Sequence, residues 1–159
     1  MKKEELFEIT ATLDTISVTK TTFLYAVNKN QKIIANEIIL IRESFLKLPD
    51  ELTDENKEYT TKKQELIEEC GERDKDNNLI LVGSNSYKIK DFKTFNLKFK
   101  ELNENHAELL VELDKINVKN QELLDEETDI KFYKIKLENV PDGLTKKQVD
   151  ALMYIIDDE

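Results

Sequence analysis

The chain has 159 residues, enough for one domain (residues 1–159) with a buried core, and its formal net charge is −10. That charge argues against nonspecific binding to nucleic acids or anionic membranes. One cysteine excludes an internal disulfide and fits a reducing cytoplasm. We expect neither a signal peptide nor a bilayer-spanning segment, because no apolar run is long enough. Only three glycines and two prolines interrupt the chain, so long helices are expected.

Residues 4–16 fit two patterns. A helix would bury the apolar residues that recur every three or four positions, which are Leu6, Ile9, Leu13 and Ile16. A strand would bury those that alternate with polar residues, which are Phe7, Ile9, Ala11 and Leu13. We favour the helix, and the strand stays the alternative.

A heptad repeat over residues 19–48 is the strongest pattern in the chain. Gln31 interrupts a seam that is otherwise apolar and consists of Leu24, Val27, Ile34, Ile38, Ile41, Phe45 and Leu48. Thr19 can cap this long helix, and Pro49 is expected to end it, because the residue before a proline avoids the helical conformation. Such a seam requires a partner helix.

A shorter helix is predicted over residues 53–70, with Asp54 and Glu55 in its first turn, where the helix dipole favours acids. Its weaker seam consists of Leu52, Tyr59, Leu66 and Cys70. Gly71 is expected to stop this helix by adopting the left-handed conformation.

An acidic stretch follows, in which Asp74, Asp76 and Asn78 alternate as the first oxygen ligands of a calcium loop do. Such a loop needs glycine at its sixth position and glutamate at its twelfth, but these positions hold Leu79 and Asn85. We therefore predict a polar turn and no metal site. The turn leads into a β-hairpin over residues 79–90, with its own turn at residues 83–86.

A second long helix is predicted over residues 91–127, with Asp91 as its N-cap. Its seam is apolar except for His106 and Asn120. We expect it to pack with residues 19–48 as an antiparallel, coiled-coil-like hairpin, or to dimerise with another copy through Asn120. Polar seam residues of this kind, Gln31, His106 and Asn120, fix helix register or oligomeric state.

Two elements complete the chain. Residues 130–138 are predicted as a strand that joins the hairpin in a three-stranded antiparallel sheet, with a bulge near Phe132 or with both faces buried. Residues 145–157 are predicted as a helix that starts with a capping box of Thr145 and Gln148 and buries Val149, Leu152 and Ile156. The fold class is therefore α+β and mostly α.

Residues that could carry catalysis are few. His106 lacks the glutamate three residues earlier that a carboxylate-bridged metal site in a helix bundle needs, because that position is Asn103. Cys70 has no second cysteine to bind zinc with, and it could act as a nucleophile only with His106 close in space. No phosphate loop, dinucleotide turn or nucleophile elbow occurs. We therefore predict no enzyme, no cofactor and no metal.

Charged side chains gather in two kinds of block. Lysines over residues 88–100 are interleaved with phenylalanines, but the phenylalanines lie on the helix seam, so we predict no direct contact with nucleic acid. With the lysines at 131–136 they are the only candidates for a pocket that would hold a signalling nucleotide. Glutamates recur at helical spacing and form an acidic surface, which consists of Glu101, Glu104, Glu108 and Glu112. This surface either binds a basic groove on another protein, as a phosphate backbone would, or is a solvated helix face.

Several segments together resemble small phage and prophage proteins of low-GC Gram-positive bacteria, whose function is uncharacterised. The similar segments are the acidic helix that ends in "GERDKDNN", the second long helix, and the ending "IKFYKIKLENV" followed by "LTKKQVDALMYIID". The family usually has glycine where this chain has Asn77 or Asn78. The resemblance implies a phage-encoded accessory protein in the host cell cytoplasm and brings no catalytic residues with it.

The function predicted from all of this is a non-enzymatic protein-binding protein. It would be a phage inhibitor of a host defence or nucleic-acid enzyme that acts through the acidic surface, with a host or phage protein as partner. The first alternative is a scaffold-like phage assembly protein that works by self-association, with a homodimer as one form. The second alternative is a sponge for a signalling nucleotide. No membrane partner is expected.

Overall fold

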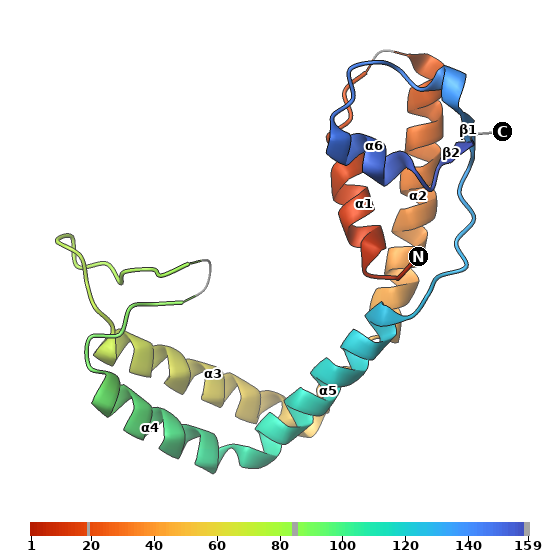
Figure 1. Cartoon of the computed structure of the whole chain (residues 1–159). Coiled ribbons are helices and arrows are strands. Elements are labelled where there is room, and N and C mark those ends of the chain that lie inside the picture. Colours follow the sequence, from red (N-terminus) through yellow and green to blue (C-terminus); the bar gives the residue numbers. More distant parts are fainter. Residues whose placement is uncertain (19, 84–85, 158–159) are drawn as a thin grey trace. The chain divides into compact units, whose positions relative to one another are not determined.

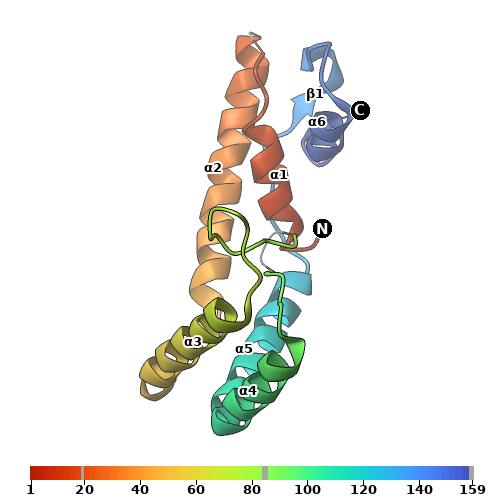
Figure 2. The ribbon, with the colours of Figure 1, turned by 90° about the vertical axis from the view of Figure 1, so that its left-hand side faces the viewer.

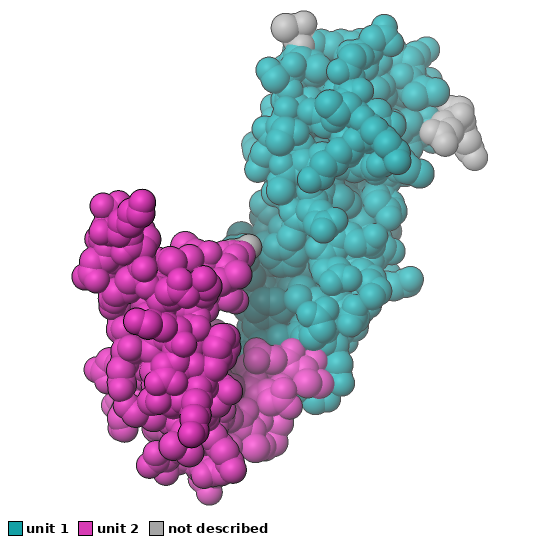
Figure 3. All heavy atoms as spheres, turned by 60° about the vertical axis from the view of Figure 1, so that its left-hand side comes forward, with its two compact units in different colours: residues 1–46, 119–159 teal, residues 47–118 magenta. Residues whose placement is uncertain are grey.

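The computed structural model describes residues 1–18, 20–83 and 86–157 (Figure 1). These residues contain six α-helices and a two-stranded sheet, so the prediction of a mostly helical chain with a small sheet is confirmed. They pack into two compact units, unit 1 of residues 1–46 and 119–159 and unit 2 of residues 47–118 (Figure 3). Each unit has its own apolar core. The prediction that both form a single domain stays a prediction.

In unit 1, the helices α1 (Glu5–Leu13) and α6 (Lys146–Leu152) pack on each other, and α1 also packs along α2 (Thr21–Ser44), as Figures 1 and 2 show. The favoured helix is therefore confirmed, over Glu5–Leu13 of the predicted residues 4–16. The core consists mainly of Leu6, Ile9 and Leu13 from α1, of Phe23, Val27, Ile34, Ile38 and Ile41 from α2, and of Leu152 and Ile155. The predicted helix over residues 145–157 ends at Leu152, and Ile156 lies in a short strand and is only partly buried. Leu152 is buried as predicted, whereas Val149 is 41% exposed. The capping box of Thr145 and Gln148 is confirmed.

The ends of α2 differ from the prediction. Lys20 occupies its N-cap position, and Thr19 lies outside the described residues. The helix ends at Ser44 and the backbone is already extended at Phe45, so the prediction that Pro49 ends it is wrong. Pro49 instead precedes the next helix as its N-cap, where its φ of −53° suits a helix start.

The buried side of α2 includes a polar residue that the heptad pattern did not single out. Asn30 is fully buried, and its amide pairs with the backbone of Tyr133. Its Nδ2 donates to the Tyr133 carbonyl oxygen at 2.9 Å, and its Oδ1 accepts from the Tyr133 N–H at 2.8 Å. The Asn30 side chain therefore supplies the two hydrogen bonds that a neighbouring strand would otherwise give to this extended segment.

The sheet of unit 1 is smaller than predicted and has other partners. Strand β1 (Ile135–Lys136) pairs in parallel with β2 (Ile156–Asp157), and a 3₁₀ turn (Leu137–Asn139) follows β1. The predicted three-stranded antiparallel sheet is wrong. Residues 130–138 are not a regular strand, because Ile130, Phe132 and Ile135 all pack on the core.

In unit 2, helix α3 (Asp50–Cys70) packs against helix α4 (Phe92–Asn105), as Figure 1 shows. The two run antiparallel, because Tyr59 Oη donates to Asn103 Oδ1 at 3.0 Å while Glu69, ten residues further along α3, pairs with Lys98. Buried side chains between them include Tyr59, Leu66 and Leu102. The prediction that residues 19–48 and 91–127 pack along each other as an antiparallel hairpin is wrong, because α2 packs on α1 while α4 packs on α3.

The predicted helix over residues 91–127 is two helices, α4 and α5 (Ala107–Asp125). Its predicted N-cap is confirmed, since Asp91 Oδ1 accepts from the Thr94 N–H at 3.0 Å. The break falls at His106, whose φ of −120° and ψ of 30° are not helical. Residues 107–118 of α5 belong to unit 2 and residues 119–125 to unit 1.

Between α3 and α4, three short extended arms around Glu72, Ile80 and Lys88 join through isolated antiparallel bridges. The backbone of Glu72 donates to Lys88, Lys88 donates to Ile80, and Ile80 donates to Glu72, at 2.7, 2.8 and 2.9 Å. These three hydrogen bonds close a ring. Residues 79–83 and 86–90 thus run antiparallel beside each other as predicted, but as part of this ring and not as a regular two-stranded ladder. The predicted turn at residues 83–86 lies partly outside the described residues.

Helix α3 ends at Cys70 with Gly71 as its C-cap, as predicted, but Gly71 does not adopt the predicted left-handed conformation. Its φ is −71°, so it is extended and not left-handed. Glycine is nevertheless required there, because a Cβ would lie 2.6 Å from the Ile67 carbonyl oxygen and would also clash with Leu79. The left-handed residue of this region is Asn77, with a φ of 66°, a conformation that asparagine tolerates better than most residues.

In the described residues no helix combines the length and the apolarity that crossing a bilayer requires.

We expect Asn30→Ala to lower the free energy of unfolding by about 2–4 kcal/mol, because it leaves the Tyr133 N–H and C=O without partners and opens a small cavity. Asn28→Ala is the matched control, since Asn28 is exposed on the same helix. Urea denaturation followed by circular dichroism measures both. Equal stability of the two variants would contradict the role given to Asn30.

Candidate functional site

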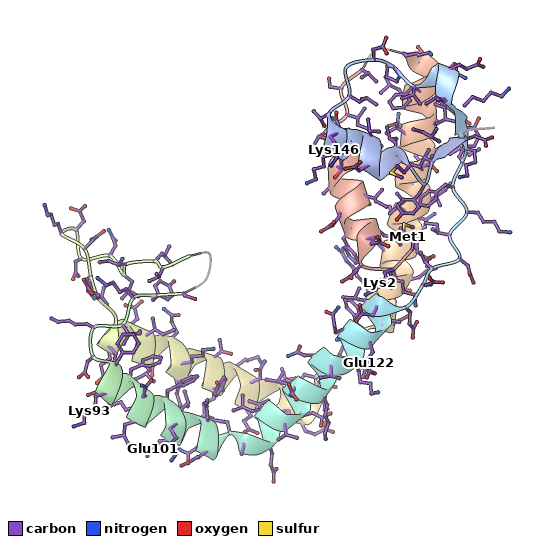
Figure 4. The ribbon with its side chains drawn as sticks, viewed as in Figure 1. Met1, Lys2, Lys93, Glu101, Glu122 and Lys146 are labelled. Carbon is purple, nitrogen blue, oxygen red and sulfur yellow. The ribbon has the colours of Figure 1, made fainter. Side chains whose placement is uncertain are left out.

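The acidic surface consists of two pairs of glutamates and not of one continuous row. Glu101 and Glu104 lie on α4, and Glu108 and Glu112 lie on α5, on the other side of the break at His106. Within each pair the spacing of three or four residues places the two side chains next to each other. Figure 4 shows Glu101 on the side of α4 away from α3.

Two of these carboxylates already have a basic neighbour. Glu112 pairs with Lys115 at 2.9 Å, and Glu104 lies 3.7 Å from Lys100. The Lys100–Glu104 pair is largely exposed and the Lys115–Glu112 pair is partly exposed, so each contributes little to stability and can be exchanged for another partner. Glu101 and Glu108 are also exposed. The acidic surface is therefore accessible to a basic partner.

An apolar groove of about 620 Å³ adjoins the second glutamate pair, at the beginning of α3 and of α5. Its residues are Pro49, Leu52, Ala107, Glu108, Val111, Glu112 and Lys115. Val111 is 56% exposed although it is apolar. The groove thus combines an apolar floor with a charged rim, which is the usual composition of the centre and edge of a protein–protein contact.

His106 directly precedes the groove residue Ala107 in the chain. Its ring is buried, its Nδ1 lies 3.0 Å from Glu55 Oε1, and it meets the Tyr59 ring edge-on at 5.5 Å between centroids. The His106 carbonyl accepts from the Leu110 N–H at 3.0 Å and so begins α5. His106 therefore makes a contact with a neighbouring polar group inside the chain, and the contact fixes where α5 starts.

The two other polar seam residues also have partners within the chain, both in unit 1. Asn120 Nδ2 donates to the Leu46 carbonyl oxygen at 3.1 Å, and its Oδ1 accepts from the Leu46 N–H at 2.8 Å. Gln31 Nε2 donates to Asp14 Oδ1 at 2.7 Å. Asn120 thus binds the segment after α2 to α5, and its role in register or dimerisation stays a prediction.

Cys70 and His106 lie at opposite ends of the α3–α4 pair. His106 contacts Glu55, and Glu55 precedes Cys70 by fifteen residues, about 20 Å along α3. Cys70 is buried, and this burial raises the pKa of its thiol. A thiol that is buried, mainly protonated and distant from a histidine is a poor nucleophile.

The lysines proposed for a nucleotide pocket divide between the units. Those at 88–100 belong to unit 2 and those at 131–136 to unit 1. Several of these lysines already have partners within the chain. Lys88 pairs with Glu72 at 2.9 Å, and Lys98 pairs with Glu69. Lys134 donates to the Tyr154 carbonyl oxygen at 3.0 Å. The aromatic residues among them divide as well: Phe99 packs on the core of unit 2, whereas Phe92 is 62% exposed.

The acidic stretch at residues 74–78 is a turn built around one carboxylate. Asp74 Oδ1 accepts from the Asp76 and Asn78 N–H groups at 2.8 and 2.9 Å. Asp74 therefore satisfies the turn's own backbone. In the part of the chain that the structure describes, no three His, Cys, Asp or Glu residues group as ligands for a metal.

Val111, Leu52 and Ala107, the floor of the groove, were not predicted as a site. The sequence does contain a signal for Val111, because it is an apolar residue off the heptad seam, in the middle of an acidic helix. Leu52 was assigned to a helix seam, and Ala107 carries no signal.

Comparison with known protein families, curated proteins and solved structures found no match. No protein-family model matches the chain, and no curated protein or solved structure is significantly similar to it.

Hydrogen bonds from the Asn78 backbone, and also from Asp76, hold the pKa of Asp74 below its ordinary value of 3.8. A carboxyl whose pKa is lower in the folded state stabilises the fold above its unfolded pKa and loses that contribution as the pH falls through the folded pKa. In an NMR titration we therefore expect the Asp76 and Asn78 amide protons to shift together with a midpoint below 3.8. Asp74→Asn should remove this transition. A midpoint at the ordinary value would contradict the turn geometry.

Proposed function

We propose that this chain is a non-enzymatic protein-binding protein and that its contact surface is the groove of unit 2 with the acidic surface around it. The observation that carries the proposal is the exposed Val111 between Glu108 and Glu112. An apolar side chain held open to solvent within a groove gains free energy when a partner covers it. The flanking carboxylates select which partner does so.

The partner's chemistry follows from that of the groove. A segment that fits it has an apolar side chain for the floor and lysine or arginine side chains for Glu101, Glu104 and Glu108. The net charge of −10 speeds the encounter with a basic partner through long-range attraction. Nucleic-acid-binding proteins have such basic segments where they contact phosphates, and carboxylates spaced along two helices can occupy these segments in place of the phosphates.

The resemblance to small phage and prophage proteins gives this proposal its biological setting. We therefore propose a phage-encoded accessory protein in the host cell cytoplasm that inhibits a host defence or nucleic-acid enzyme by covering its basic surface. The partner is a host or phage protein.

Assembly by self-association is the second candidate function, and it too is supported by a specific observation. Leu97 on α4 is 70% exposed, and Lys93 and Lys100 lie one helical turn before and after it. This part of α4 therefore has an apolar side chain and nearby lysines, which are the features expected of a segment that binds the groove.

Capture from a bacterial lysate, with the full chain as bait and quantification of the retained proteins, tests the proposed function. Reversing the charge of Glu101, Glu104 and Glu108 to lysine should lower retention of the specific partner by roughly tenfold or more. The matched control reverses three exposed acids of unit 1, Glu43, Asp129 and Glu138, and changes the net charge equally. If both triple variants retain the partner as well as the unmodified chain, or lose it to the same extent, the acidic surface is not the contact.

A further inference from the structure

One face of α4 is exposed and has no partner on α3. It consists of Lys93, Leu97 and Lys100, which are spaced four and three residues apart and therefore share one side of the helix. Leu97 is 70% exposed, the Lys100 side chain is 76% exposed, and Figure 4 shows Lys93 on the side of α4 away from α3. We name Lys93, Leu97 and Lys100 the α4 face.

The α4 face and the groove match in polarity, and each carries charges of both signs. The face has Leu97 between Lys93 and Lys100, with Glu101 one helical turn after Leu97 and Glu104 next to Lys100. The groove has an apolar floor with Glu108, Glu112 and Lys115 on its rim, so that lysines of the face can meet glutamates of the rim and glutamates of the face can meet Lys115. The spacing agrees as well. Lys93 and Lys100 are seven residues apart, so they are separated by about 10 Å, and Glu108 and Glu112 are four apart, about 6 Å. Long lysine side chains easily cover the difference.

A chain cannot place its α4 face in its own groove. Leu97 precedes Ala107, a groove residue, by ten residues, which is about 15 Å along α4. To bring Leu97 onto Val111, α4 would have to unfold and leave α3, with which it buries Tyr59 and Leu102. The α4 face is therefore available only to the groove of another molecule.

We infer that the groove of one copy binds the α4 face of a second copy, with Leu97 against Val111 and Leu52, and with Lys93 and Lys100 close to Glu108 and Glu112. This inference rests on the proposed function, since it uses the same groove, and it names the occupant as the chain itself. The contact joins two different surfaces. Each dimer therefore keeps one free groove and one free α4 face, and growth continues until the copies close into a ring or form an open chain.

The area of one helix face in a shallow groove is small compared with the interface of a stable dimer, so the self-association is weak and depends on concentration. Self-association would compete with a foreign partner for the groove at high protein concentration and leave the groove open at low concentration.

The test is sedimentation velocity of the full-length chain up to about 1 mM, a range that reaches weak contacts. Two variants each remove one side of the contact, Leu97→Asp on the α4 face and Val111→Asp in the groove. Both sites are exposed, so both variants should fold. Val118→Asp is the matched control, since Val118 is 49% exposed on the same helix as Val111 but outside the groove.

The unmodified chain and the control should self-associate, and each of the two variants should do so roughly tenfold more weakly or not at all. A mixture of the two variants should form a one-to-one dimer, because the Leu97→Asp copy still has a groove and the Val111→Asp copy still has an α4 face. The inference is overturned if the unmodified chain stays monomeric or if the mixture of the two variants does not pair. It is also overturned if either variant self-associates as strongly as the unmodified chain.

The same variants separate this inference from the proposed function when the lysate capture is repeated at bait concentrations too low for self-association. If Val111→Asp loses the foreign partner while the unmodified chain stays monomeric, the self-association is wrong and the proposed function stands. If Val111→Asp loses self-association but retains the foreign partner, the groove is a contact between copies and the proposed function is wrong.

Discussion

The contact between the buried His106 ring and the partly exposed Glu55 carboxylate is the interaction on which the geometry of the binding surface depends. It is a hydrogen-bonded pair, 3.0 Å apart, between the end of α4 and the first turns of α3. The His106 ring faces inward against Glu55 and Tyr59, and the non-helical backbone of His106 separates α4 from α5. Ala107, Glu108 and Val111 then begin a new helix beside Leu52, and the groove is the space between them.

In unit 1, the side chains of two asparagines form with irregular segments the pairs of backbone hydrogen bonds that a neighbouring strand forms in a sheet. Asn30 pairs with the backbone of Tyr133, and Asn120 pairs with the backbone of Leu46, each through one donor and one acceptor. Each extended segment thereby satisfies backbone groups that would otherwise lack a partner on a helix surface. A chain with few β-strands can thus hold long connections in place, and its sheet can be as short as two residues per strand.

Features that depend on a few neighbouring residues could be predicted from the sequence, and those that depend on the choice of a distant partner could not. The caps at Asp91 and Thr145 were readable because cap and helix lie within three residues of each other. A heptad seam shows which side of a helix is buried but not what covers it, so α2 was given the wrong partner. Asn30 lies on the buried stripe between Val27 and Ile34, where its polar side chain could have been noticed. The break at His106 depends on Glu55 and Tyr59, which no local pattern contains.

The central claim is that the groove and the α4 face are complementary surfaces on one protein. Methyl NMR spectra of the full chain, recorded over a dilution series, test this most directly because they report each surface separately. The account predicts that the Leu52, Val111 and Leu97 methyl signals shift with concentration and that the Val118 signals do not. Signals that stay constant at all three positions, or that move equally at Val118, would contradict it.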